Sequence, residues 1–118
     1  ASPPQMYNTH KGVEEMEIHY KRGDKNSVAY IVGEVDHHNA KTARESIDKR
    51  IAEYGSECFG LDLSGVTFCD SSGLGLVMGR MKKCAECGSE LIILNPSPAA
   101  YKILKIAGMD KLLKIRSE

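Results

Sequence analysis

The sequence lacks an excess of either charge, because sixteen Lys and Arg residues balance sixteen Asp and Glu residues. The formal net charge of +0 gives no electrostatic reason to expect nucleic acid or an anionic membrane as the main partner. Long apolar runs are also missing, since stretches such as Leu91-Ile92-Ile93-Leu94 are far too short to span a bilayer. No charged start followed by an apolar segment marks a signal peptide. We therefore expect a cytoplasmic protein that binds neither membrane nor nucleic acid directly.

What the sequence does contain is typical of one globular domain. Its 118 residues are 42% hydrophobic and 27% charged, which is enough for a single buried core. The four cysteines, at positions 58, 69, 84 and 87, have no export signal beside them, so we expect free thiols. Because no long apolar face is left over, a monomer is expected.

The first fifteen residues differ from the rest of the chain. Residues 1–15 show no sustained hydrophobic period, which predicts a flexible N-terminal segment, a cloning remnant or a peptide docked on the domain. Residues 16–118 are predicted to form a single domain. It would begin with a hairpin, formed by a strand from Met16 to Tyr20 and a second strand over 28–32.

Three helices, separated by strands, are predicted after the hairpin. Asn39 as N-cap and Gly55 as C-cap would bound the first helix, and the second would run from Gly73 to about Glu86. Ser97-Pro98 is a typical start for the third. The predicted inner faces are Ala40, Ala43, Ile47, Ile51 and Tyr54 in the first helix, Leu74, Val77, Met78 and Met81 in the second, and Tyr101, Leu104 and Ala107 in the third.

The remaining segments are strands, expected over 58–63, 90–95 and 112–115. On the second helix, Gly75 and Gly79 form a stripe of small residues that would let this helix lie close to a sheet. The resulting order, β-β-α-β-α-β-α-β, predicts an α/β fold with a mixed β-sheet and helices packed against it.

The stretch Asp70-Ser71-Ser72-Gly73-Leu74-Gly75 lies where a predicted strand ends and a predicted helix begins. Ser71 or Ser72 would cap that helix, and the free N–H groups of its first turn would favour an anion. A phosphate on a serine at this place would leave its surroundings folded, so a phosphorylation switch is physically sensible. The structural alternative is that the serines only form a turn and a cap.

Three segments, in this order along the chain, resemble the STAS domains of anti-sigma factor antagonists. The stretch Phe68–Gly75 is similar to the family's Asp-Ser-Ser-Gly signature, and Gly33–Ala40 is similar to its Gly-Glu-Leu-Asp-type loop. The third likeness is Ser97-Pro98-Ala99 with the following helix to Gly108-Met109. The resemblance covers roughly residues 16–116 and is nearest to the sporulation type.

This resemblance implies a STAS-like mixed sheet and a switchable interaction module without catalytic activity, cofactor or metal. The unphosphorylated form would bind an anti-sigma factor that is also a serine kinase, and would thereby free the sigma factor. The kinase would phosphorylate Ser71, ending the interaction, and a metal-dependent serine phosphatase would reverse the modification. Partner contacts are expected from Asp36, His37, Asn39, Asp70, Ser72, Gly73 and Leu74.

Two other classes of function stay open. One is a regulatory or ligand-sensing STAS module of a transporter or a stress-signalling complex. The other is an enzyme, in the form of a thiol oxidoreductase at Cys84 and Cys87. These cysteines form a Cys-x-x-Cys motif at the end of a predicted helix, where the helix dipole does not lower a thiol pKa. A triad of Asp36, a histidine and Ser71 lacks the Gly-x-Ser-x-Gly motif of hydrolases.

Overall fold

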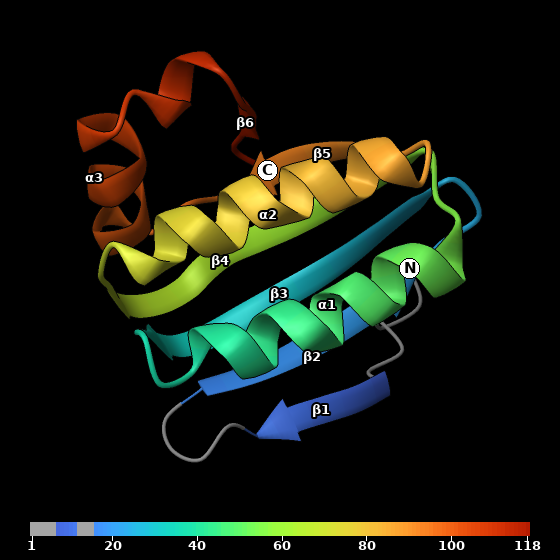
Figure 1. Ribbon diagram of the computed structural model, residues 1–118, viewed down its shortest axis with the longest axis horizontal. Coiled ribbons are helices and arrows are strands. Elements are labelled where there is room, and N and C mark those ends of the chain that lie inside the picture. Colours follow the sequence, from blue (N-terminus) through green and yellow to red (C-terminus); the bar gives the residue numbers. More distant parts are fainter. Residues whose placement is uncertain (1–6, 12–15) are drawn as a thin grey trace.

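The structure is a computed structural model that describes residues 7–11 and 16–118. Its elements, shown in Figure 1, are β1 (Tyr7–Lys11), β2 (Met16–Arg22), β3 (Asn26–Val35), α1 (Ala40–Tyr54), β4 (Cys58–Cys69), α2 (Ser72–Glu86), β5 (Glu90–Leu94), α3 (Pro98–Ile106), the 3-10 helix η1 (Met109–Lys111) and β6 (Lys114–Arg116). None of the helices in these residues is long and apolar enough to cross a membrane.

The strands form one six-stranded mixed sheet in the order β1-β2-β3-β4-β5-β6. The first three strands pair antiparallel, and β3 to β6 pair parallel. From Met16 onward the predicted order of strands and helices is confirmed. Strand β1 is an addition, because residues 7–11 lie in the segment predicted to be flexible or docked and pair with β2. Residues 1–6 and 12–15 lie outside the described residues.

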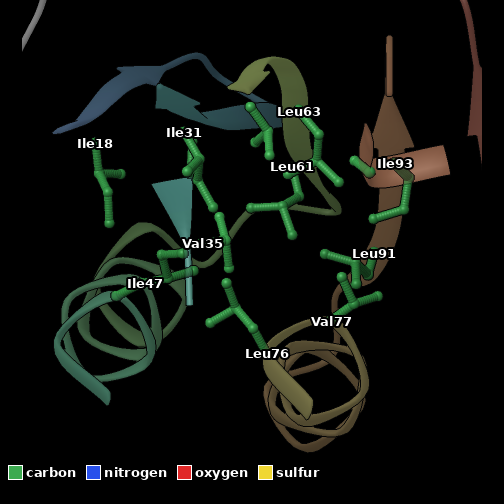
Figure 2. Close-up of a cluster of buried hydrophobic side chains, with 14 of the residues drawn as sticks. Ile18, Ile31, Val35, Ile47, Leu61, Leu63, Leu76, Val77, Leu91 and Ile93 are labelled. Atoms are coloured by element: carbon green, nitrogen blue, oxygen red, sulfur yellow. The ribbon is translucent and has the colours of Figure 1, made fainter. Parts of the chain in front are cut away.

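One face of the sheet carries the hydrophobic core. Helices α1 and α2 lie side by side over this face, and α3 lies near the start of α2 (Figure 1). In the core, Ile18, Ile31 and Leu61 from the strands meet Ile47 from α1 and Leu76 from α2 (Figure 2). The other face of the sheet carries no helix in the part of the chain that the structure describes.

Helix α1 follows the sequence prediction. Ala43, Ile47 and Ile51 are buried on its inner face. Gly55 ends the helix with φ +57°, a left-handed conformation that glycine adopts without steric cost.

Helix α2 is rotated relative to the prediction. Its buried residues are Gly73, Leu76, Val77, Arg80 and Cys84, whereas Met78 is 51% exposed. The predicted stripe of Gly75 and Gly79 faces away from the sheet, because a Cβ atom at either glycine would meet nothing within 4 Å. The hydrophobic spacing predicted the wrong inner face because an arginine, normally a surface residue, lies on the inner face of α2.

An ion pair between α1 and α2, in which Arg80 is buried and Asp48 is half-buried, explains this arginine. Arg80 is 3% exposed, and its Nε lies 2.6 Å from Oδ1 of Asp48, while Nη2 donates to Oδ2 at 3.1 Å. Nη1 donates to the carbonyl of Leu76 at 3.3 Å. Burial lowers the pKa of Arg80, and the nearby Asp48 opposes this shift. The pair therefore joins the two helices.

Helix α3 begins as predicted, because the Ser97 Oγ accepts a hydrogen bond from the N–H of Ala100 at 3.2 Å. Leu104 is buried, but Tyr101 and Ala107 are exposed rather than inward-facing. The end of the chain also differs from the expected strand over 112–115. A 3-10 turn comes first, and the strand is the shorter β6.

We predict that Asp48→Ala lowers the free energy of unfolding by about 3 kcal/mol, because it leaves the buried Arg80 guanidinium without its partner. Chemical denaturation of both proteins measures the difference. The control is Lys49→Ala, an exposed neighbour on α1 whose loss should change stability by less than about 0.5 kcal/mol. Equal effects of the two substitutions would contradict the assigned importance of the ion pair.

Candidate functional site

The two signature loops meet at one end of the parallel strands. Strands β3 and β4 end in register, with Val35 opposite Cys69. The N–H of Asp70 donates to the carbonyl of Val35 at 3.1 Å, which ties the second loop to the end of β3. Asp36 and Asp70 are each the first residue after these paired strand ends. The structure thus brings together the two segments that the sequence analysis singled out separately.

The side chain of Asp70, and not that of a serine, caps helix α2. Its Oδ1 accepts a hydrogen bond from the N–H of Ser72 at 2.7 Å, and its carbonyl accepts from the N–H of Gly73 at 3.0 Å. The N–H of Leu74 donates to the carbonyl of Ser71 at 3.1 Å. Ser71 occupies the N-cap position, as predicted, but its side chain makes no cap hydrogen bond. The predicted free N–H groups of this first turn are already satisfied by Asp70 and Ser71.

Ser71 is left pointing into solvent by this arrangement. Its backbone is helical, with φ −62° and ψ −18°, and its side chain makes no capping hydrogen bond. The residue is exposed, whereas Ser72 and Leu74 on either side of Gly73 are half-buried. A hydroxyl held at a defined place on the surface is accessible to a modifying enzyme.

The loop before α1 uses the same device. Oδ1 of Asp36 accepts hydrogen bonds from the N–H groups of His38 at 2.9 Å and Asn39 at 3.0 Å. Asn39, predicted as the N-cap, makes no side-chain cap bond; it is buried, and its Nδ2 donates to the carbonyl of Glu34 at 3.0 Å. Through this hydrogen bond to Glu34, Asn39 holds the loop together. The helix is capped by Asp36 because only its carboxylate reaches the free amides.

His37 and His38 are exposed at the same end of the molecule. Their ring centroids lie 4.0 Å apart with a tilt of 38°, so the two rings contact each other. Among the described residues, no group of three or more His, Cys, Asp or Glu side chains is arranged to hold a metal ion.

Beneath the signature turn the protein is closely packed. A Cβ atom at Gly73 would lie 2.3 Å from the Sγ of Cys69 and 3.7 Å from Val35, so only glycine fits there. The cavity under the turn measures about 10 Å³, which is room for about one water molecule. Burial and the neighbouring Asp70 raise the pKa of the Cys69 thiol. The turn is thus a surface feature on a solid base and not the mouth of a substrate pocket.

The Cys-x-x-Cys motif does not form a reactive pair. Cys84 is fully buried, and both Cys84 and Cys87 are free thiols. Burial and the neighbouring Cys87 raise the pKa of Cys84 to about 12. A thiol oxidoreductase needs the opposite shift, toward the thiolate at neutral pH. The geometry therefore gives no support to the enzyme alternative.

Comparison with known proteins gives one consistent picture. The family model described as STAS domain matches residues 17–118. An anti-sigma F factor antagonist of Paenibacillus polymyxa is 31% identical over 101 residues, which cover 86% of this chain and 85% of that protein. The anti-sigma factor antagonist SpoIIAA in its unphosphorylated form is 28% identical, with a TM-score of 0.71 over 87% of this chain and 89% of that one. A structure of the Bacillus cell fate determinant SpoIIAA in the phosphorylated form is also 28% identical, with a TM-score of 0.64 over 87% and 92%.

The contact beneath the turn predicts opposite effects for two substitutions on α2. Gly73→Ala should lower the free energy of unfolding by about 1 to 3 kcal/mol, because the new methyl group collides with Cys69. Gly75→Ala should raise it by about 0.5 to 1 kcal/mol, because alanine favours the helix and meets nothing there. Denaturant titrations measure both. Adding Cys69→Ala to Gly73→Ala should recover part of the loss, and strict additivity would show that the two residues do not touch.

The raised pKa of Cys84 predicts that this thiol resists alkylation in the folded protein. At about pH 8, a thiol with a pKa near 12 is thiolate in only about one molecule in ten thousand. Peptide mass spectrometry after iodoacetamide treatment should find Cys84 unmodified in native protein and modified after denaturation. Rapid native labelling, or cysteine-dependent disulfide reduction, would restore the oxidoreductase hypothesis.

Proposed function

The chain belongs to the STAS domain family, and we propose that within it the protein is an anti-sigma factor antagonist switched by phosphorylation of Ser71. The observation that carries the proposal is the placement of Ser71, exposed and free of any capping role, at the turn that joins the two signature loops. The name of the Paenibacillus polymyxa relative supports the antagonist function. The unphosphorylated and phosphorylated structures of SpoIIAA support a switch of this kind in a protein of similar fold.

In the proposed cycle, unphosphorylated protein binds an anti-sigma factor that is also a serine kinase, and the sigma factor is released. The Oγ of Ser71 then attacks the γ-phosphorus of ATP held by that partner. The bond from this phosphorus to the bridging oxygen breaks, ADP leaves as the product, and the serine proton passes to a base of the kinase. A metal-dependent serine phosphatase would hydrolyse the phosphoserine and restore the binding form.

The local geometry explains why phosphate would end the interaction. It adds about −1.5 to −2 charges, and the first amides of α2 are not available to neutralise them. The new group would stand beside the Asp70 carboxylate and against the surface of the partner. A repulsion of about 4 kcal/mol lowers affinity roughly a thousandfold. The fold itself need not change, because the base beneath the turn stays packed.

Direct contacts with the partner are proposed for the residues that stand at the surface of the two loops. These are Asp36 and His37 on the first loop and Asp70, Ser72 and Leu74 on the second. Asn39 and Gly73 are buried, so they would act by holding the loops in place. We propose a cytoplasmic setting of the sporulation type for this cycle, with the protein itself having no catalytic activity.

The test is a pull-down from lysate of the source cells with ATP or ADP present. The baits are wild type, Ser71→Ala and Ser71→Asp, with Ser117→Asp as a control that adds the same charge at an exposed serine elsewhere. Wild type, Ser71→Ala and Ser117→Asp should retain an ATP-binding kinase, and Ser71→Asp should not. Mass spectrometry should find phosphate on Ser71 of wild type. If all baits behave alike and Ser71 stays unmodified, the switch is excluded and the fold serves a ligand-binding or scaffold role.

A further inference from the structure

Strand β4 carries two irregularities near its end that change which side chains face solvent. Tyr30 pairs with Asp62, but two residues further along β3 the partner is Gly65, so β4 has one residue more than its neighbour. A second extra residue lies between the pairs Gly33–Val66 and Glu34–Phe68. Such bulges redirect side chains and are common beside functional sites.

The second bulge turns Phe68 out of the core. In a regular strand Phe68 would share the buried side of Val66, two residues earlier. Instead it lies beside Glu34, on the face of the sheet opposite the helices, and is 47% exposed. Without the bulge the side chain would be hidden, so the fold gives up apolar burial to present a phenylalanine.

A second apolar side chain lies close to it on the same face. Val32, two residues before Glu34 on β3, is 40% exposed. Its Cγ2 lies 3.0 Å from the place where a Cβ of Gly65 would stand, so Val32 covers the glycine of β4. We call Val32, Gly65 and Phe68 the β3–β4 patch. Diagonal neighbours across a strand pair are within reach of an aromatic ring, and both exposed side chains lie next to the signature loops.

The surroundings of the β3–β4 patch are acidic. Glu34 lies between its two exposed side chains, Glu17 pairs with Val32 from β2, and Asp36 and Asp70 follow at the strand ends. Glu17 also lies 3.6 Å from His19 and pairs with Lys11 of β1, so these two residues are the basic neighbours of the patch on the outer strands. Neither residues 26–40 nor residues 51–79 contain a lysine or arginine, although the chain as a whole has no net charge. The basic residue next in sequence, Lys41, is on α1 and so on the helix side.

We infer that the β3–β4 patch is a second docking surface for the anti-sigma factor. In the complex, an apolar pocket of the anti-sigma factor receives the patch, and lysine and arginine side chains of the anti-sigma factor surround that pocket. This inference rests on the proposed function. The anti-sigma factor is the occupant that fits, because Phe68 is followed directly by Cys69, Asp70 and Ser71, so one partner that covers Ser71 reaches the patch as well. The partner then holds the end of the sheet from both faces, with Phe68 as an aromatic anchor on one and Ser71 on the other. Anchors of this kind carry much of the affinity of an interface.

The test measures binding of purified variants to the purified anti-sigma factor recovered with the Ser71→Ala bait, by isothermal titration calorimetry. Phe68→Ala should weaken binding by about tenfold or more. Its control is Ile106→Ala on α3, which removes a side chain that is 74% exposed far along the chain and should leave affinity unchanged. Thermal unfolding verifies that both variants are folded.

A charge reversal tests the acidic surroundings without removing apolar contacts. Glu34→Lys should weaken binding and reduce the dependence of the affinity on salt. The control Glu86→Lys, at the C-terminal end of α2, should do neither. Glu34→Lys keeps the inference testable if Phe68→Ala does not fold.

The outcomes separate the two proposals. If Ser71→Asp abolishes binding while Phe68→Ala and Glu34→Lys bind like wild type, the docking surface is wrong and the switch stands. Loss of affinity with Ile106→Ala equal to that with Phe68→Ala would also overturn the docking surface, because exposed apolar area in general would then be responsible. If no kinase is recovered and Ser71 has no effect, the proposed function fails and the inference fails with it.

Discussion

The parallel pairing of β3 with β4 is the contact on which the site depends. It places Val35 opposite Cys69, so the loops that follow these residues begin next to each other at the same end of the sheet. The hydrogen bond from the N–H of Asp70 to the Val35 carbonyl closes this junction. If the two strands slipped by one residue, every side chain at their ends would change faces. The junction would then separate Asp36 from Ser71.

Each loop also uses an aspartate to begin a helix, and this has a chemical consequence. Asp36 and Asp70 satisfy the amides at the starts of α1 and α2, so neighbouring residues are not needed as caps. Ser71 and the two histidines are thereby left at the surface. The same aspartates place negative charge where the proposed phosphate would be added, so under the proposed function they would add to its repulsion of a partner. Local helix capping and the proposed switch therefore have one physical origin.

Packing around the site separates rigidity from exposure. Gly73 lies against Cys69, and the ion pair of Arg80 with Asp48 holds α2 to α1, so the base of the turn is held from two directions. On the opposite side of the sheet, Val32 and Phe68 are exposed, and Phe68 would lie on the buried side if β4 were regular. A rigid base with exposed polar and apolar groups is suited to recognition of a protein. It leaves no pocket beneath the signature turn in which a small substrate could react.

The sequence by itself determined the order of elements from Met16 onward, the inner face of α1, the helix start at Ser97 and the place of the Asp70–Gly75 stretch between a strand and a helix. These depend on local periodicity and turn chemistry, which neighbouring residues specify. Tertiary structure alone decided that Arg80 and not Met78 faces inward, and that Phe68 faces solvent. The arginine is buried only because Asp48 on another helix pairs with it. Phe68 is exposed only because β4 is longer than the strand beside it, and a difference in length between paired strands appears in neither strand's own sequence.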